Sequence, residues 1–434
     1  MASLKEFIKK LTPPWILEIY HFLWAFVGAL IYGFPGKKLK IIGITGTNGK
    51  TTTTHLLTHI LETAGYKVAS LSSLRFKLGS REWINELKMT MPGRMNVQRF
   101  LYEAVKEKIT HIILEVTSEG IKQHRHEFIP FAGAVLTNIT KEHLEAHGGF
   151  ENYKMAKFKL FKAVEKSAVE NNFVVVNLDD PAGKEFMNVK VKQKIGYSIN
   201  KETKSFPDFI LQKAENIKQV GSKTLFEVSG IKFQTNLLGH YNVSNVLAAI
   251  STAEIIGIDQ KTLKTAVEKF IGAPGRLEVV SEKPYKVVVD YAHTPDALEK
   301  VYSTLKASGG SLVCVLGSAG GGRDKWKRKE LGKIAAQYCR QIIVTNEDPY
   351  DENPSDIIDE VAKGAESFGK RAEKVLDRKE AVKLALTLAE KTDTIIITGK
   401  GAEPWMVVAQ GKKIPWDDRL VVKQLLAKMK NTKQ

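Results

Sequence analysis

Residues 43–57 read GITGTNGKTTTTHLL, in which a β-rich run ends in a glycine turn and is followed by a helix-like segment. Glycines at positions 46 and 49 let backbone N–H groups turn towards phosphate oxygens, and the start of the helix adds a positive dipole. The strict Walker pattern would need glycine where Ile44 stands, so only its second half is retained. We expect Lys50 to reach the β- and γ-phosphates and Thr51 to face Mg²⁺. The segment predicts an ATP-binding loop made of Gly46, Thr47, Asn48, Gly49, Lys50, Thr51 and Thr52.

From residue 38 onward, short β-branched runs alternate with helical patterns, which is typical of βαβ units and a mainly parallel sheet. Strands are expected at residues 38–45, 110–116, 132–139 and 172–178, and later at 286–291, 311–317, 341–347 and 393–399. Two helical patterns, at 242–257 and 259–270, precede Ala273-Pro274-Gly275, which reads as a hinge. The prediction is an α/β protein with an apolar segment at 1–37, a central P-loop ATPase domain at 38–274, and a Rossmann-like α/β domain at 275–434.

The composition narrows the class of protein. A formal net charge of +17 over 434 residues suits nucleic acid, an anionic membrane surface or an anionic substrate. The basic residues are scattered and no zinc-finger or RNP-like motif is present, so no nucleic-acid partner is expected. The only cysteines are Cys314 and Cys339, which exclude a disulfide framework and a four-cysteine metal site. A reducing, cytoplasmic compartment fits this usage best.

An apolar, aromatic segment covers residues 15–34 and is flanked by lysines on both sides. Glu18 and His21 argue against a span, and no small-residue cleavage site follows. Three interpretations stay open: a true span, attachment to the inner face of the membrane, or a soluble docking or dimer helix. The protein is expected to be a monomer or a weak dimer.

Polar residues follow two neighbouring strands in the expected sheet. Glu115 ends the strand at 110–116, while Asn138 and His143 come just after the strand at 132–139. In an open α/β sheet ligands collect at the carboxyl ends of strands, so these side chains should face the phosphate loop. Each taken singly could also be a helix cap or a surface side chain.

Here the chain resembles the Mur ligases, whose consensus passes in order through the segments read here as EVTS (115–118), TNI (137–139), EHLEAH (142–147) and YKMAK (153–157). The resemblance implies that Glu115 and His143, with Thr51, hold two Mg²⁺ ions. It also implies that Lys157 is carbamylated, which would turn a cation into an oxygen-donating anion. One departure is Glu142, where the family usually has aspartate.

The resemblance extends through LLGHYNVSNVLAAI (237–250), APGRLE (273–278) and VVVDYAHTPDALEKV (287–301). By that resemblance Arg276 and Asp290 contact the nucleotide, with His293 in the same motif. Arg276 would offset charge on the migrating phosphoryl group, although a hinge salt bridge is the competing interpretation. The segment at 317–332 resembles the tripeptide-synthetase branch and offers Arg323, Lys327 and Arg328 either as anion contacts or as a solvated basic turn.

Substrate residues are expected at two further places. The branch's D-N-P-R motif, which marks diaminopimelate enzymes, reads EDPY at 347–350, so no arginine is present to grip a distal carboxylate. Asp348, Tyr350 and Glu403 are the candidates for the amino acid. For the acceptor the resemblance implies Thr90, Gln123 and Arg125.

The resemblance implies an ATP-dependent ligase that joins a free amino acid to a muramoyl-peptide-like carboxylate through an acyl phosphate, in peptidoglycan precursor synthesis. The catalytic candidates are Lys50, Glu115, His143, Lys157 and Arg276. By the same resemblance we expect the family's usual amino-terminal domain for uridine diphosphate to be absent, so a lipid-linked acceptor is a further hypothesis. The alternatives are a folylpolyglutamate synthetase-like ligase and a non-catalytic nucleotide-binding membrane scaffold.

Overall fold

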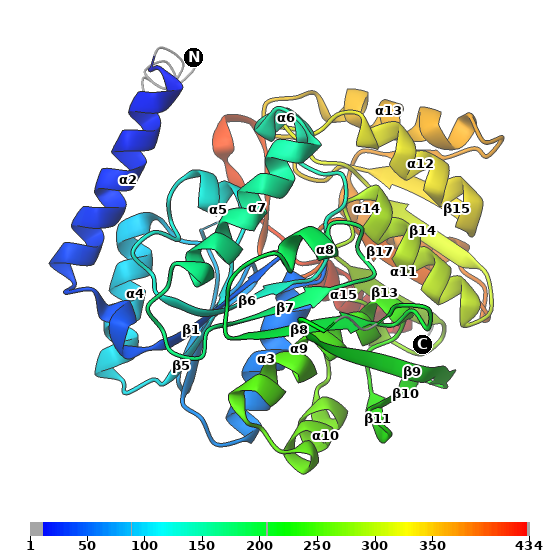
Figure 1. The fold of residues 1–434 in the computed structure, drawn as a ribbon. Helices are drawn as coiled ribbons and strands as arrows, with labels where there is room; N and C mark the ends of the chain where they lie inside the picture. The colour runs from blue at the N-terminus through cyan, green and yellow to red at the C-terminus, as the bar shows by residue number, and fades with distance from the viewer. Residues whose placement is uncertain (1–11, 88, 205–206, 432–434) are drawn as a thin grey trace.

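The computed structural model describes residues 12–87, 89–204 and 207–431, which fold around two sheets (Figure 1). The larger sheet has the strand order β11-β10-β9-β8-β7-β6-β1-β5-β2-β3-β4. Its strands are β1 (Lys40–Thr45), β2 (Val68–Leu71), β3 (Arg75–Leu78), β4 (Arg81–Ile84), β5 (His111–Glu115), β6 (Phe131–Leu136), β7 (Phe173–Asn177), β8 (Gln193–Ser198), β9 (Ile210–Val220), β10 (Lys223–Val228) and β11 (Ile231–Thr235).

The centre of this sheet is parallel, as predicted: β1 pairs in parallel with β5 on one side and β6 on the other. The antiparallel margins were not predicted. Strands β9, β10 and β11 form one margin and β2, β3 and β4 the other. In β3, β10 and β11 buried residues alternate with more accessible ones, because one face of the sheet is solvated there.

Alternate residues of β1 enter two separate cores, which explains why the strand is apolar throughout. Ile41 packs on the side of α4 (Arg94–Lys106) and α7 (Phe150–Glu165). Ile42 and Ile44 pack on the opposite side, which is covered by α3 (Lys50–Thr63), α9 (His240–Ile256) and α10 (Gln260–Lys269). Both helices expected at residues 242–270 are therefore present.

The smaller sheet has the order β12-β13-β17-β14-β15-β16 and contains the four later strands expected from the sequence. Its strands are β12 (Glu278–Ser281), β13 (Lys286–Asp290), β14 (Leu312–Leu316), β15 (Cys339–Thr345), β16 (Glu373–Val375) and β17 (Thr394–Thr398). The helices around it are α11 (Pro295–Ala307), α12 (Lys327–Tyr338), α13 (Pro354–Glu366), α14 (Arg378–Leu388) and α15 (Asp418–Asn431). A hairpin of β18 (Trp405–Val407) and β19 (Lys413–Pro415) lies outside the sheet.

Cys314 and Cys339 lie on the adjacent strands β14 and β15 and are joined by a disulfide. The cysteine count excluded a framework of several disulfides, but it did not predict this single bond. Their separation of 25 residues in sequence gives no sign that the two strands pair.

At the amino-terminal side, α2 (Pro14–Ile31) runs along the edge of the molecule and packs on α4 (Figure 1). It is followed by the short helix η1 (Pro35–Lys38). Among the residues described, no helix combines the length and the apolar character needed to cross a membrane. The remaining short helices are α5 (Ser118–Lys122), α6 (Leu144–His147), α8 (Gly183–Phe186) and η2 (Ala409–Gly411).

Candidate functional site

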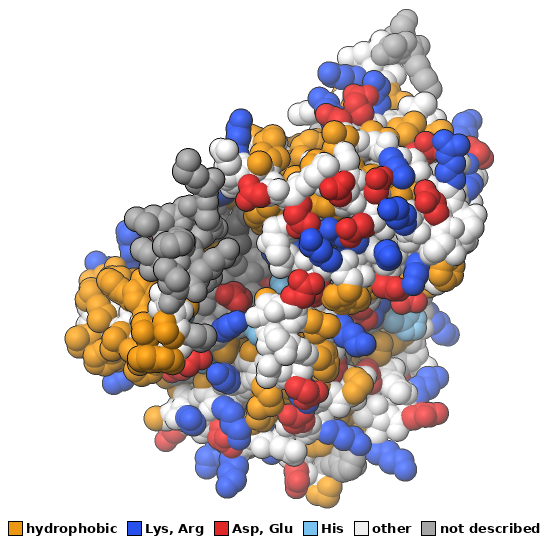
Figure 2. Space-filling view, turned by 90° about the horizontal axis from the view of Figure 1, so that it is seen from above, with side chains coloured by type: hydrophobic (Ala, Val, Ile, Leu, Met, Phe, Trp, Pro, Cys, Tyr) orange, Lys and Arg blue, Asp and Glu red, His pale blue; other side chains and the backbone are white. Residues whose placement is uncertain are grey.

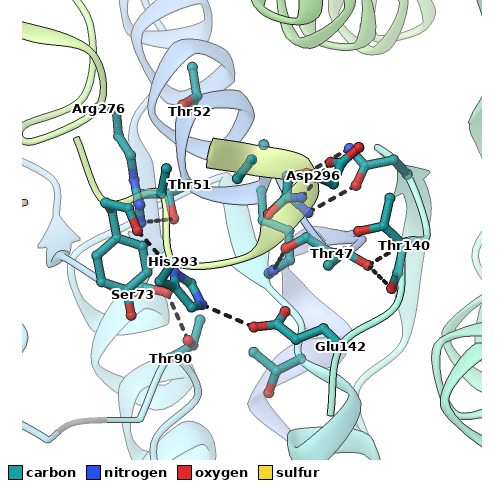
Figure 3. A pocket seen from close by; sticks show the side chains of 18 of the residues that line it. Thr47, Thr51, Thr52, Ser73, Thr90, Thr140, Glu142, Arg276, His293 and Asp296 are labelled. Atoms are coloured by element: carbon teal, nitrogen blue, oxygen red, sulfur yellow. Dashed lines mark hydrogen bonds and ion pairs between the residues drawn. The ribbon is translucent and has the colours of Figure 1, made fainter. Parts of the chain in front are cut away.

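A cleft of about 1420 Å³ is lined by residues from both sheets and from the loops at their carboxyl ends. The phosphate loop, Glu115 and His143 line it from the larger sheet, and Arg276, His293 and Glu403 from the other part of the chain. Figure 3 shows Thr51, Ser73, Glu142, Arg276 and His293 pointing towards one shared space. The site residues predicted from the sequence line this cleft, except Gly46, Lys157 and Arg328. Gly46 is part of the loop itself, and Lys157 contacts the loop through Gly46 O.

The phosphate loop needs glycine for two reasons, backbone angle and space. Gly46 has φ +149° and Gly49 has φ +86°. A Cβ on Gly46 would lie 1.9 Å from Thr137 Oγ1, and one on Gly49 would lie 2.2 Å from Asn245 Oδ1. The loop is thus fitted closely against its neighbours, and α3 begins at Lys50 with its first N–H groups facing the cleft.

Asn138 supports the loop through its amide group. Asn48 N donates to Asn138 Oδ1 (2.9 Å), and Asn138 Nδ2 donates back to Asn48 O (3.0 Å). Asn48 Nδ2 also donates to Asp296 Oδ2 (2.9 Å), which links the loop to α11 across the cleft. Asp296 was not identified from the sequence.

A buried lysine and a half-buried one converge on a single carbonyl group. Lys157 Nζ donates to Gly46 O at 2.7 Å, and Lys50 Nζ donates to Gly46 O at 3.0 Å and to Thr47 O at 2.8 Å. Burial lowers the pKa of Lys50, and burial together with the nearby charge of Lys50 lowers the pKa of Lys157 well below its ordinary value. An anion in the loop would offset this concentration of positive charge.

Glu115 is buried at the end of β5 with both carboxylate oxygens engaged. Thr51 Oγ1 donates to Oε2 (3.0 Å), and Ser73 donates through its backbone N to Oε2 and through its hydroxyl to Oε1, both at 2.9 Å. The Ser73 hydroxyl lies 2.8 Å from that of Thr90. Ser73 was missed from the sequence, although its place just after β2 at the same sheet edge could have indicated it.

Glu142 connects the two halves of the cleft. Its Oε1 lies 3.0 Å from His293 Nε2 and 3.9 Å from His143 Nε2. Burial alone would raise the pKa of Glu142, but the hydrogen bond from His293 and the neighbouring positive charges lower it well below its ordinary value. Burial also lowers the pKa of His143 to about 4, so its ring is neutral near pH 7 and available as a ligand. From the sequence, Glu142 was noted only as a glutamate at a position where the resembling family usually has aspartate.

The residues present fit a magnesium ion that uses few protein ligands. Among the described residues there is no cluster of three or more His, Cys, Asp or Glu side chains suited to a metal. Mg²⁺ usually keeps several waters and is held by one or two carboxylates together with substrate phosphates. Glu115 beside Thr51 supplies that minimal set next to the loop, and His143 lies on the same cleft.

Arg276 and Asp290 belong to the part of the chain after residue 274, and Arg276 reaches the phosphate loop. Arg276 Nη2 donates to Thr51 Oγ1 (3.4 Å), and its guanidinium lies 4.1 Å from the centre of the Tyr291 ring. Asp290 accepts from the backbone N–H groups of Leu277 and Ala292, both at 2.6 Å. Asp290 therefore fixes the turn that carries Arg276, and burial raises its pKa.

A second charged group lies beside Tyr291, whose hydroxyl donates to Glu403 Oε1 (3.2 Å). Lys400 Nζ is fully buried and donates to both oxygens of Asp348 (3.1 and 3.0 Å) and to Glu403. Burial would lower the pKa of Lys400, but the two carboxylates raise it. Asp348 and Glu403 thus bring two carboxylates together at the cleft, which suits an incoming amine, and the Arg323 guanidinium lies close to Glu403. Tyr350 lines the same end with φ +53°. Lys400 was missed from the sequence, although it lies inside the GKGAEPW segment.

Arg125 contributes a buried cation near Thr90 and Gln123. Its guanidinium donates to Met91 O (2.5 Å), to Gln123 Oε1 (2.6 Å) and to Met89 Sδ (3.3 Å). Its Nε is buried and has no hydrogen-bond partner in the described structure. No carboxylate is among these contacts, so an anionic ligand would be well matched here.

One interpretation is wrong. Arg328 was offered as an anion contact, but it is 1% exposed and pairs with Glu352 (2.8 Å) and Glu360 (3.4 Å) inside the smaller α/β unit. Its neighbours Arg323 and Lys327 do line the cleft. Lys327 and Arg328 are consecutive residues of α12 and therefore face different directions, while Arg323 lies in the loop before this helix.

Two protein families match the chain. Residues 44–253 match the Mur ligase middle domain, and residues 275–401 match the Mur ligase glutamate ligase domain. A UDP-N-acetylmuramoyl-L-alanyl-D-glutamate–2,6-diaminopimelate ligase from Halalkalibacterium halodurans is 35% identical over 405 residues, covering 92% of this chain and 81% of its own. The ligase of the same name from Aquifex aeolicus is 35% identical and covers 91% and 79%.

Solved structures agree with these matches. One with the same diaminopimelate-ligase description is 30% identical with a TM-score of 0.59, covering 90% of this chain and 79% of that one. A folylpolyglutamate synthase from Mycobacterium tuberculosis has a TM-score of 0.69 at 17% identity, covering 87% of this chain and 92% of that one, which shows the shared fold alone.

Proposed function

The chain belongs to the Mur ligase family, and from this premise we propose that it joins an amino acid to the carboxylate of a muramoyl-peptide-like acceptor, with ATP as the energy source. ATP-dependent amide-bond formation follows from membership of the family. One observation carries this proposal. The phosphate loop, Glu115 beside it, Arg125 and the carboxylates of Asp348 and Glu403 all line a single cleft.

The proposed reaction has two steps. The acceptor carboxylate oxygen attacks the γ-phosphorus, the new P–O bond forms, and the bond to the ADP oxygen breaks. The neutral amine then attacks the acyl carbon, and phosphate leaves with the former carboxylate oxygen while the amine's proton is released. Lys50 and Arg276 lie where they would stabilise charge on the phosphoryl group. Arg125 would hold the acceptor, and Asp348 with Glu403 would hold the incoming amino acid.

When bound, Mg²⁺ would neutralise phosphate charge, and we propose that Thr51, Glu115 and His143 hold it, with carbamylated Lys157 serving a second ion. The support for a carbamate on Lys157 is its burial without a carboxylate partner, beside the charge of Lys50. A lowered pKa increases the fraction of neutral amine at a given pH, and only the neutral amine adds to carbon dioxide. As pH falls through the lowered pKa, the amine is protonated and the carbamate should be lost.

We expect protein incubated with ¹³C-bicarbonate to give one carbamate resonance by ¹³C NMR at neutral pH, absent from Lys157→Met. The control is Lys159→Met, which removes an exposed lysine from the same helix and should keep the resonance. A resonance that persists in Lys157→Met would show that another amine is modified.

The amino acid added is proposed to lack a second, distal carboxylate. The relatives' printed names specify diaminopimelate. In this chain Tyr350 stands at the end of the EDPY segment and supplies a hydroxyl and a ring in place of the arginine of the D-N-P-R motif.

The test is mass analysis of the products made from ATP, a uridine-linked muramoyl dipeptide and an equimolar mixture of amino acids that includes lysine and diaminopimelate. We expect one new amide, with phosphate released in equal amount and with diaminopimelate disfavoured at least about tenfold, since one bidentate pair contributes about 1.5–3 kcal/mol. Preferred addition of diaminopimelate would contradict the specificity, and no amide with any amino acid would contradict the function.

Two structural expectations also stay proposals. The division at 1–37, 38–274 and 275–434 is supported by one sheet on each side of residue 275. Contact of residues 15–34 with a membrane surface is supported by the exposed apolar side chains of α2.

A further inference from the structure

Helix α2 exposes large apolar side chains on most of its circumference. The most exposed are Trp15, Ile19, Tyr20, Leu23, Leu30 and Ile31, each between 51% and 62% accessible. Figure 2 shows hydrophobic side chains gathered over this helix at the left edge of the molecule. Contiguous exposed apolar surface of this kind marks an interaction site on a folded protein.

The helix is fixed to the body by a narrow stripe of small residues. Ala25 and Ala29 are buried against α4, and a Cβ on Gly28 would lie 3.2 Å from Met95 Cα. Small residues allow the two helices to approach closely, but they cover little of α2. The larger side chains on its other faces are therefore left facing outward.

The charges around α2 indicate which partner covers it. Lys37, Lys38 and Lys40 follow the helix and are exposed, and the sequence places Lys5, Lys9 and Lys10 before it. Within the helix the one acidic residue is Glu18. A second copy of a chain with net charge +17 would bring like charges together. An apolar helix flanked by lysines is complementary to a membrane surface that carries anionic headgroups.

The same helix contacts the loop that carries the acceptor residues. The Phe22 ring lies 5.2 Å from that of Phe128, and Arg94 contacts His21. Arg94 Nε also donates to Gln123 O at 2.9 Å. Arg125, two residues after Gln123, lines the cleft.

We propose that α2 lies in the headgroup region of an anionic membrane and holds the acceptor end of the cleft beside it, so that the enzyme takes an acceptor carried on a lipid. This inference rests on the proposed function for the nature of the acceptor. The membrane contact itself rests on the helix alone. Both parts use the same surface, so one set of variants tests them.

Sedimentation of the full chain with vesicles tests the contact. We expect binding to phosphatidylglycerol–phosphatidylcholine vesicles, weak binding to phosphatidylcholine alone, and weaker binding at high salt, because salt screens the lysines. The variant Leu23→Gln/Leu30→Gln/Ile31→Gln should bind at least about tenfold more weakly, since interfacial affinity scales with the apolar area inserted. The matched control, Ile210→Gln/Val220→Gln/Ile271→Gln, removes equally exposed apolar side chains elsewhere and should bind like the parent.

Equal binding by the two triple variants, or no binding by the parent, would overturn the contact. The contact would also be overturned if light scattering showed that the parent is a dimer and that the α2 variant is a monomer. Phosphate release with a soluble uridine-linked acceptor, measured without vesicles, reports on the proposed function separately. With a muramoyl dipeptide anchored on a lipid in the vesicles, the parent should turn over at least about tenfold faster than the α2 variant. Equal rates there would overturn the lipid-linked acceptor.

Discussion

Replacing Lys50 with methionine should lower substrate-dependent phosphate release by about 10³-fold, the upper end of what removing one preorganised donor costs. The Lys50 ammonium lies within the loop, at 3.0 Å from Gly46 O and 2.8 Å from Thr47 O. Among the described residues, no other lysine side chain donates to both of these carbonyl groups. Methionine keeps a similar length and removes the charge. Steady-state phosphate release with saturating acceptor and amino acid measures the effect.

The control is Lys159→Met, which removes one charge from an exposed site and should leave the rate within about twofold, as surface substitutions usually do. Thermal melting of both variants separates a folding defect from a catalytic one. A Lys50→Met protein that folds and keeps more than a tenth of the parent rate would remove this lysine from the mechanism.

Replacing Glu115 with glutamine should lower the rate by about 10²–10³-fold and raise the Mg²⁺ concentration needed for half-maximal activity. The side chain is isosteric, and its amide can still accept from Thr51 and donate to the Ser73 hydroxyl, so the hydrogen-bond network survives. What is lost is the negative charge that attracts the ion. Rates measured over a Mg²⁺ titration give both quantities.

An exposed counterpart, Glu170→Gln, should change neither the rate nor the Mg²⁺ dependence. If Glu115→Gln loses activity with an unchanged Mg²⁺ dependence, Glu115 acts only in positioning Thr51 and Ser73. The metal assignment would then be wrong, while the nucleotide site would stand.

The sequence anticipated the residues whose positions follow from strand ends. Glu115 and the phosphate loop come after the adjacent parallel strands β5 and β1, and side chains at the carboxyl ends of neighbouring parallel strands meet at one edge. His143 and Arg276 were placed through the family resemblance, and both line the same cleft. Their chemical roles remain predictions.

What could not be anticipated depends on pairing between distant segments. Glu142 acts on His293 across 151 residues, and Asn48 on Asp296 across 248, and local pattern contains no information about such contacts. Arg328 and Arg323 belong to one basic segment, yet one is buried in ion pairs and the other lines the cleft. The antiparallel margin β9–β11 was missed because its half-solvated strands lack the continuous apolar runs of the central ones.

The most direct test of the central claim follows oxygen from the acceptor into phosphate. With both oxygens of the acceptor carboxylate labelled as ¹⁸O, the two-step reaction predicts one labelled oxygen in each phosphate released and one in the amide, read by mass spectrometry. Phosphate released without ¹⁸O, while the amide forms, would mean that no acyl phosphate is made and would contradict the account.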